Sequence, residues 1–161
     1  MKPSQLRFVL LLTLTFAACK SQASRTEPES PALQPSAYER LTEYHLPPGL
    51  LPDNVLNYTL KADGEFTLTL KSKCSIVYSI PDDEVLVHYD KHITGTLKNL
   101  AISDLTGVST KEFFWLAVTL IHKDKIDDDV VYFNAGYLYR SFPESVFASP
   151  RSCSANLSPE V

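Results

Sequence analysis

An alternation of apolar and polar residues with a period of two runs through the middle of the chain and limits what it can fold into. In "NVLNYTLKADGEFTLTLK", residues 54–71, two alternating runs flank Asp63-Gly64. Successive side chains of a β-strand point to opposite faces of a sheet, so each run is typical of a half-buried strand. Asp-Gly between two such runs favours a hairpin turn, because glycine readily adopts a positive φ angle. The stretch therefore predicts a β-hairpin with Leu68 and Leu70 on its buried face.

Similar runs continue to residue 142. "CSIVYSI", "EVLVHYD" and "HITGTLKNLAI" are separated by residues 81–83 and by Asp90-Lys91, and "DVVYFNAGYLYRSF" follows further on. Seven or eight short strands at this spacing are typical of an all-β sandwich or barrel. We therefore expect an all-β fold, with the strands joined by short turns.

One short helix is predicted before the strands. Ser36 and Glu39 have the spacing of a capping box, in which each side chain accepts a hydrogen bond from the backbone amide of the other residue. Apolar and aromatic residues around Leu41 recur at helical intervals, and the "PPG" of residues 47–49 ends the pattern. Residues 143–147 suggest one further helical turn near the end of the chain.

The first 23 residues have the pattern of a secretory signal peptide. They contain a positively charged start, an apolar core from Phe8 to Ala18, and small residues at 21–23 that suit a cleavage site. An uncleaved membrane anchor and a lipoprotein signal around Cys19 are the alternatives. Residues 24–36 are rich in proline, serine and glutamate, which is typical of a flexible linker. We therefore expect a protein of the secretory pathway.

The charge of the remaining chain is negative. Residues 1–23 carry three of the 15 lysines and arginines and none of the 19 acidic residues. This leaves 12 basic residues (15 minus three) against 19 acidic ones, a formal charge of −7. Such a balance argues against nucleic acid as a partner, and against electrostatic attraction to anionic membranes. We also expect no membrane-spanning segment once the signal peptide is removed.

Cysteines and glycosylation motifs suit the same compartment. Cleavage after residue 23 leaves Cys74 and Cys153, an even pair that could form a disulfide or remain two buried thiols. Asn57 and Asn156 head the two N-glycosylation sequons. Asn57 is expected on the polar face of a strand, whereas Asn156 lies in a tail, residues 154–161, that we expect to be disordered.

The segment "KEFFWLAVTLIHK", residues 111–123, is apolar on both faces if it is a strand. We expect such a strand, with a bend or bulge near Ala117. One interpretation is that both faces are covered by other parts of the protein. A second is that one face lines a cavity for an apolar ligand, and a third is an exposed patch for membrane or partner contact. The candidate ligand-binding residues are Phe113, Phe114, Trp115, Leu116, Val118 and Leu120.

Several longer motifs extend over most of the chain. They are "YERLTEYHLPPGLLPDNVLNYTL", "VHYDKHITGTL", "ISDLTGVSTKEFFWLAV", and "GYLYRSFPESVF" followed by a cysteine. In this order and at this spacing they resemble the plant family known as the domain of unknown function 538. The resemblance covers residues 37–153, which we treat as one β domain.

This resemblance implies an all-β fold of two small antiparallel meander sheets that exchange strands, and an association with stress responses in plants. It implies a destination in the cell wall or apoplast, or in the vacuole. Proposals for the family include lipid binding, chlorophyll binding and esterase-like activity, but no catalytic residues are established that could be carried over. The paired cysteines of the family fall on Cys74 and Cys153, which favours a disulfide between them.

No motif of a known enzyme or metal site is present. The nearest approach to the G-x-S-x-G of serine esterases is "GVST", residues 107–110, which lacks the second glycine and is interpreted as a turn. His88 and His92 have the spacing of a metal-chelating pair on a helix, but this region is predicted as strand, turn and strand. The acidic "DKIDDD", residues 124–129, lacks the glycine and distal glutamate of a calcium loop. We therefore expect no catalytic residue, no metal site and no cofactor.

The sequence thus predicts a secreted binding protein without catalytic activity, whose ligand is a lipid or another apolar small molecule. This function predicts a cavity on the order of a few hundred Å³ beside residues 113–121. One alternative is a cell-wall interaction protein with a solid core and no ligand. A less favoured alternative is an esterase-like hydrolase, which requires a serine, a histidine and an acid, or two carboxylates, within hydrogen-bond reach.

Overall fold

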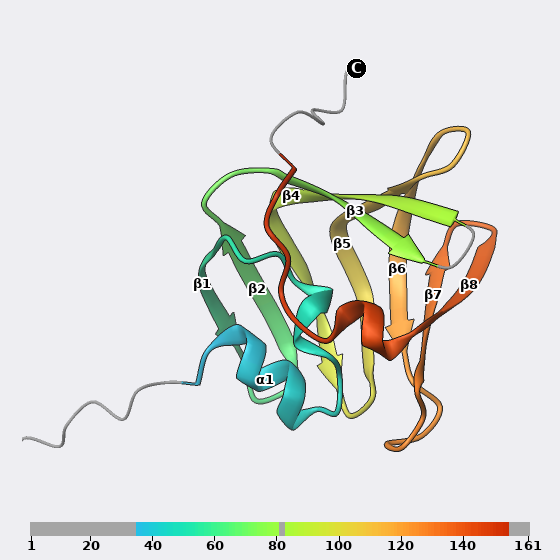
Figure 1. Cartoon of the computed structure of the whole chain (residues 1–161). Helices are drawn as coiled ribbons and strands as arrows, with labels where there is room; N and C mark the ends of the chain where they lie inside the picture. The colour runs from blue at the N-terminus through green and yellow to red at the C-terminus, as the bar shows by residue number, and fades with distance from the viewer. Residues whose placement is uncertain (1–34, 81–82, 155–161) are drawn as a thin grey trace, which may run out of the picture. The chain divides into compact units, whose positions relative to one another are not determined.

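A computed structural model of the chain describes residues 35–80 and 83–154. The predicted signal peptide, nearly all of the predicted linker and tail, and Asn156 lie outside these residues. The described part contains one α-helix, two 3-10 turns and eight strands (Figure 1). Their bounds are α1 Ala37–Glu43, η1 Pro48–Leu50, β1 Val55–Leu60, β2 Glu65–Leu70, β3 Cys74–Ile80, β4 Asp83–Lys98, β5 Ala101–Lys111, β6 Trp115–His122, β7 Val130–Ala135, β8 Leu138–Pro143 and η2 Glu144–Phe147.

The predicted N-terminal helix and its capping box are confirmed. The Glu39 amide donates to Ser36 Oγ at 3.2 Å, and the Ser36 amide donates to Glu39 Oε2 at 2.6 Å. The helix ends at Glu43, before the two prolines, and His45 follows with a φ of 61°. Leu41 is the residue that α1 buries most completely, so the helix packs through a single narrow face.

The predicted β-hairpin is formed by β1 and β2. Gly64 has a φ of 91° in the connecting turn, where the Lys61 amide donates to the Glu65 carbonyl at 2.9 Å. Leu68 and Leu70 are buried as expected, with exposed fractions of 2% and 0%. Asn57 is exposed in β1, on the face that could accept a glycan.

The eight described strands join in one antiparallel sheet with the order β1-β2-β4-β5-β6-β7-β8, and β3 pairs with β4 beside this path. The sheet is open, because β1 and β8 stand at its two ends. The predicted all-β fold with one short N-terminal helix is therefore confirmed. The strands form a single hydrogen-bonded network rather than two separate sheets.

That network depends on β4, which is 16 residues long. The predicted break at Asp90-Lys91 is wrong, because the strand continues through these residues. Instead β4 changes partner there: residues 83–89 pair with β3, whereas residues 92–96 pair with β2. Two strand signals that the sequence places apart are therefore the two halves of one strand.

The interpretation of residues 107–110 as a turn is also wrong, because they lie inside β5. Gly107 has a φ of 80°, and the register between β5 and β6 shifts between Ile102 and Ser109. A side chain at this glycine would place its Cβ 2.4 Å from the His92 carbonyl oxygen. The glycine therefore marks an irregular, bent strand where two backbones approach closely, which the sequence pattern does not distinguish from a turn.

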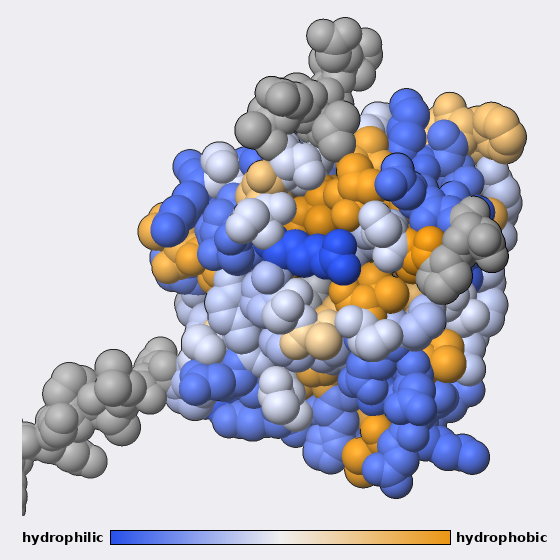
Figure 2. Space-filling view, in the orientation of Figure 1, coloured by the Kyte–Doolittle hydropathy of each residue, from blue (hydrophilic) through white to orange (hydrophobic). Residues whose placement is uncertain are grey.

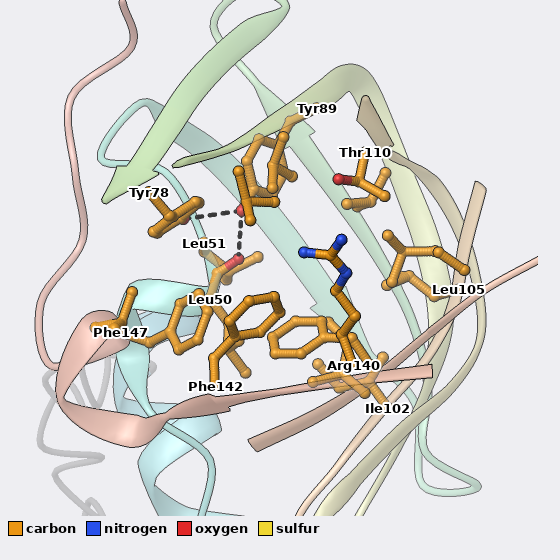
Figure 3. A pocket seen from close by; sticks show the side chains of 18 of the residues that line it. Leu50, Leu51, Tyr78, Tyr89, Ile102, Leu105, Thr110, Arg140, Phe142 and Phe147 are labelled. Carbon is orange, nitrogen blue, oxygen red and sulfur yellow. Dashed lines mark hydrogen bonds between the residues drawn. The ribbon is translucent and has the colours of Figure 1, made fainter. Parts of the chain in front are cut away.

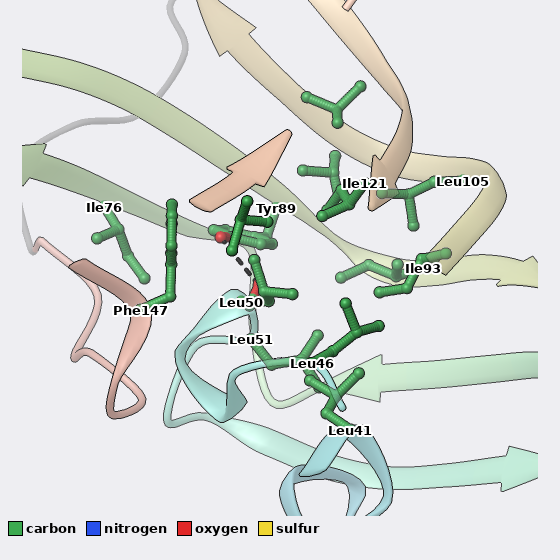
Figure 4. Packing of buried hydrophobic residues seen from close by; sticks show 14 of the residues in the cluster. Leu41, Leu46, Leu50, Leu51, Ile76, Tyr89, Ile93, Leu105, Ile121 and Phe147 are labelled. Carbon is green, nitrogen blue, oxygen red and sulfur yellow. Dashed lines mark hydrogen bonds between the residues drawn. The ribbon is translucent and has the colours of Figure 1, made fainter. Parts of the chain in front are cut away.

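The hydrophobic core lies between the sheet and the segments that cover one of its faces. Figure 1 shows α1, η1 and η2 in front of this face. Leu41, Leu50 and Phe147 from these segments meet the sheet residues Ile93 and Ile121 in the interior (Figure 4). Full burial of one such side chain contributes roughly 1.5–3 kcal/mol, so the covering segments supply much of what holds the sheet together.

A disulfide fastens the end of the described chain to β3. Cys74 and Cys153 are bonded across a sequence separation of 79 residues. Beside it, the Ser154 amide donates to the Ser75 carbonyl at 2.7 Å, and the Asp53 amide donates to the Arg151 carbonyl at 3.0 Å. The segment after η2 is therefore held along its length.

All the described elements, their core and the disulfide fall within residues 34–161, one compact unit of the chain. This part therefore carries its own core and crosslink. No helix within the described residues is long and apolar enough to cross a membrane.

Candidate ligand-binding site

An apolar cavity lies between the sheet and its covering segments (Figure 3). Its volume is about 60 Å³. Side chains from η1, η2 and strands β2 to β8 form its wall. The wall residues labelled in Figure 3 are Leu50, Leu51, Tyr78, Tyr89, Ile102, Leu105, Thr110, Arg140, Phe142 and Phe147.

The cavity is smaller than the sequence led us to expect. One water needs roughly 10–15 Å³ of such volume, so this cavity exceeds a single water, whereas pockets for drug-sized ligands are roughly 300–1,000 Å³. Three aromatic rings of its wall pack against one another. Phe133 lies 5.4 Å from Phe142 and 5.3 Å from Phe147 between ring centroids. An occupant as large as a lipid chain therefore requires these rings to move.

Two tyrosine hydroxyls form the buried polar part of the wall. Tyr78 and Tyr89 lie 3.0 Å apart between hydroxyl oxygens, and each reaches a carbonyl of η1, that of Gly49 at 3.1 Å and that of Leu50 at 3.2 Å. Burial raises the pKa of both hydroxyls, that of Tyr89 well above 10.0. Both tyrosines are therefore neutral, and they attach η1 to β3 and β4 without placing a charge in the cavity.

One end of the cavity is closed by ion pairs. Arg140 on β8 contacts Glu112 at 3.0 Å and Asp83, at the start of β4, at 3.0 Å. The Glu84 amide and then Arg140 lower the pKa of Asp83 by hydrogen bonding to its carboxylate. Arg140 and Glu112 both line the cavity. They connect the last strand of the sheet to β4 and to the turn before β6.

Of the six predicted ligand-binding residues, Val118 lines this cavity. Leu116 is buried in the core and Leu120 is half-buried, but neither belongs to the wall. A register shift between Val118 and Leu120 turns Ile121 inward, where it joins Val118 in the wall. The irregularity expected near Ala117 is thus present slightly further along the strand.

The three aromatic residues predicted to bind ligand lie elsewhere. Phe113 and Phe114 precede β6 and are exposed, with exposed fractions of 95% and 53%. Trp115 is half-buried, with its ring centroid 5.9 Å from that of His88 and the Lys111 ammonium 5.2 Å above it. The expected strand therefore begins only at Trp115, and its two faces are not both covered.

The requirement for a hydrolase can be tested at the contact between Ser75 and His88. These cross-strand neighbours lie 2.9 Å apart between Oγ and Nδ1, and His88 Nε2 lies 3.8 Å from Asp90 Oδ1. The second distance is too long for a hydrogen bond. Ser75 and His88 are only 5% and 6% exposed, and neither lines the cavity. The arrangement resembles a catalytic triad in composition but gives a substrate no access to the serine.

No cluster of three or more histidine, cysteine, aspartate or glutamate residues in the described part of the chain is arranged to hold a metal ion. His88 and His92 both lie on β4, where His88 is buried and His92 is exposed. His122 lies on β6 and stacks on Tyr132, with ring centroids 5.2 Å apart.

Replacing His88 with glutamine should weaken the pH dependence of stability. Burial disfavours the imidazolium and lowers the pKa of His88 below 6.5, against a smaller opposing effect of Asp90. At pH values near and below 6.5 the unfolded chain therefore binds more protons than the folded chain. The free energy of unfolding accordingly decreases as the pH is lowered through this range. Denaturant unfolding between neutral pH and about pH 5 measures this slope.

The matched control is His92→Gln, at an exposed position of the same strand. It should retain the slope of the wild-type protein. A slope in the His88→Gln variant equal to that of the wild type would show that other groups set the pH dependence.

Fold and site together define a class of protein: an open antiparallel sheet with one face covered by short helical segments over an apolar cavity. The profile of the family described as "Protein of unknown function, DUF538" matches residues 37–148, and the chain belongs to this family. An uncharacterised protein of Arabidopsis thaliana is 32% identical over 99 residues, which cover 61% of this chain and 55% of that protein. The chain thus spans about half the length of this plant relative. No solved structure matches the chain.

Proposed function

We propose that this protein is an exported, non-catalytic binding protein whose ligand is apolar, such as a lipid acyl chain. The observation that carries this proposal is an apolar cavity of about 60 Å³ in the centre of the core. Close-packed interiors contain few voids larger than a water. An apolar void of this kind stays dry and has affinity for apolar groups.

Export is supported by the signal-like start of the sequence and by the disulfide between Cys74 and Cys153. Structural disulfides persist in oxidising compartments and are rare in the cytosol. The exposed Asn57 is available for a glycan on the same route. A role in plant stress responses, and the cell wall, apoplast or vacuole as destination, enter the proposal through the family resemblance alone.

The entrance that we propose lies at Arg140. The strand that carries it, β8, pairs with β7 on one side and stands at the end of the sheet. Its other side is held by the ion pairs of Arg140 with Asp83 and Glu112. Partly exposed ion pairs of this kind contribute only about 0–1 kcal/mol. Separation of β8 from β4 would move Phe142 away from the cavity and enlarge it.

Filling the cavity should weaken ligand binding. Ala135 on β7 is 4% exposed and lines the cavity, so a leucine there places three additional carbons in the space. Binding of a fluorescent fatty-acid analogue should weaken by at least about tenfold, whereas overpacking should cost roughly 1–3 kcal/mol of stability. Fluorescence titration measures the dissociation constant, and thermal unfolding establishes that the variant is folded.

Ala117→Leu is the matched control, because Ala117 is exposed on the neighbouring strand β6. It should bind the probe like the wild type. Equal binding by both variants would place the ligand outside this cavity. Native mass spectrometry of protein purified from its own tissue would then identify a bound apolar molecule.

The small volume of the cavity favours one other function, that of a cell-wall interaction protein with a solid core. This alternative predicts that wild-type protein binds no apolar probe and carries no small molecule from its tissue. This alternative would be excluded if the wild-type protein binds the probe, Ala135→Leu removes that binding and Ala117→Leu preserves it.

A further inference from the structure

Two turns at the same end of the sheet expose aromatic side chains that touch each other. Phe113 and Phe114, between β5 and β6, are 95% and 53% exposed, and Tyr137, between β7 and β8, is 68% exposed. The rings of Phe114 and Tyr137 lie 6.1 Å apart between centroids. We call these three residues the aromatic tip. Figure 1 shows the β5–β6 turn projecting from the body of the sheet, and Figure 2 shows a hydrophobic lobe at the same upper right corner.

The turn holds its phenylalanines outward. The Glu112 amide donates to the Phe114 carbonyl at 3.2 Å, which closes the turn, and Glu112 is in turn bound by Arg140. Two phenylalanines in water at a projecting turn have no role in the core that the sheet encloses. Leu56 and Ile126 are also exposed, at 59% and 53%, but they lie on β1 and in the β6–β7 loop, which is at the other end of β6 from the tip (Figure 1).

The residues in and beside the tip are of the types that suit a bilayer surface. Trp115 follows the two phenylalanines, and the Lys111 ammonium lies over its ring. Tryptophan and tyrosine favour the interface between acyl chains and water, and lysine side chains reach from it toward the headgroups. Exposed phenylalanines and a tyrosine beside a half-buried tryptophan and a lysine are therefore residue types found together at a lipid surface.

Charge and shape favour a zwitterionic lipid surface over an anionic one and over a protein partner. Charges of both signs lie beside the tip, Lys111 and Arg140 against Glu112 and Asp83, so the tip does not require an anionic lipid. The tip is also convex and consists of three side chains. A protein interface of standard size buries roughly 800 Å² on each partner and needs a broader face.

We propose that the aromatic tip docks on the surface of a zwitterionic lipid bilayer by inserting Phe113 and Phe114 between the headgroups. Glu112, next to Phe113 in the chain, lines the cavity together with Arg140. Docking would therefore bring the entrance of the cavity to the bilayer, so that an apolar ligand passes between them without crossing water. This last step rests on the proposed function, whereas docking itself does not.

The chain contains one tryptophan, Trp115, directly behind the tip, and its fluorescence reports docking. Residues 34–161, which contain the whole described core and disulfide, are titrated with phosphatidylcholine vesicles. We expect a blue shift of the emission, and quenching when the vesicles contain acyl chains brominated near the headgroup. The double substitution Phe113→Ser and Phe114→Ser should weaken vesicle binding on the order of a hundredfold, because burial of each phenylalanine strengthens binding by about tenfold or more.

The control replaces Leu56 and Ile126, which are also exposed but lie away from the tip, with serine. It should bind vesicles like the wild type. Wild-type protein that does not bind phosphatidylcholine vesicles, or that binds only anionic ones, would overturn the proposal, as would equal loss in both double variants.

The same variants separate this inference from the proposed function. The tip variant should still bind the fluorescent fatty-acid analogue from solution, because its cavity is unchanged. The Ala135→Leu variant should lose that analogue and still dock on vesicles. A variant that loses vesicle binding but still binds the analogue therefore tests the aromatic tip alone. A variant that loses the analogue but still binds vesicles tests the cavity alone.

Discussion

Replacing both Cys74 and Cys153 with alanine should lower the free energy of unfolding by about 4 kcal/mol, which is about a quarter or more of the stability of a typical domain. The disulfide closes a loop with a sequence separation of 79 residues. In the chain-entropy model such a crosslink acts mainly by restricting the unfolded chain. Its loss should also release the segment after η2 from β3, because the hydrogen bond between Ser154 and Ser75 is adjacent to it.

Urea unfolding of residues 34–161 measures this change. The wild-type protein treated with a reducing agent is the matched control, since it loses the crosslink without any substitution. Its stability should fall to that of the double variant, which should itself be insensitive to the reducing agent. A double variant as stable as the oxidised wild type would mean that the disulfide contributes nothing to the folded state.

Gly49→Ala should have the second largest effect, roughly 3 kcal/mol of lost stability. A Cβ at this position of η1 would lie 2.4 Å from the Phe147 carbonyl oxygen and 2.5 Å from the Ser149 carbonyl oxygen. Both are backbone atoms of the C-terminal segment, so rotation of a side chain cannot relieve the contact. The segment that carries Phe147 would have to move away from η1, and the cavity wall would open with it.

Two measurements test this expectation, urea unfolding and the binding of a dye that fluoresces on exposed apolar surface. The control is Gly136→Ala in the exposed β7–β8 turn, where the φ of 60° costs about 1 kcal/mol but the Cβ would contact only Leu116 Cδ2 at 3.4 Å. It should bind no more dye than the wild type. Equal losses of stability in the two variants would show that the blocked contact between η1 and the C-terminal segment does not add to the effect of an ordinary glycine replacement.

Both predictions concern the segments that cover one face of the sheet, and not the pairing of the strands within the sheet. The cavity has a wall because η1 and η2 lie over the sheet, and Tyr78 and Tyr89 hold η1 there. The C-terminal segment is in turn held by the disulfide. Looser attachment of either segment should therefore change ligand binding as well as stability.

Local pattern alone was sufficient for several elements. The alternation in residues 54–71 predicts the hairpin, and the bounds of "CSIVYSI" coincide with those of β3. The capping box at Ser36 and Glu39 predicts the start of α1. Each of these depends on interactions between residues close in the chain, so it can be recognised without knowledge of the fold.

Prediction from local pattern was wrong where residues typical of turns lie inside a strand. Asp90-Lys91 has the composition of a turn, but β4 continues through it because one half of the strand pairs with β3 and the other with β2. Gly107 likewise has a positive φ inside a strand, where a close approach to His92 requires it. The choice of partner strand depends on residues far away in the chain, and no local signal records it.

The candidate site was likewise predicted only in part from the sequence. The sequence indicated that residues 111–123 are too apolar for an ordinary surface strand, and Val118 and Ile121 do line the cavity. It gave no sign that Leu50 and Phe147 would complete the wall, because these residues come from covering segments at opposite ends of the domain. Nor did it separate Phe113 and Phe114, which lie in water, from Leu116, which lies in the core.

By itself, the sequence determined the strand-forming character of the chain, its short first helix and its family, because periodicity, capping and motif order are local or linear properties. Only the tertiary structure decided which strands pair, where the two cysteines meet, which side chains enclose the cavity and which aromatic residues remain outside it. These outcomes depend on packing between distant segments, where burial of apolar surface selects one arrangement among many that the local pattern allows.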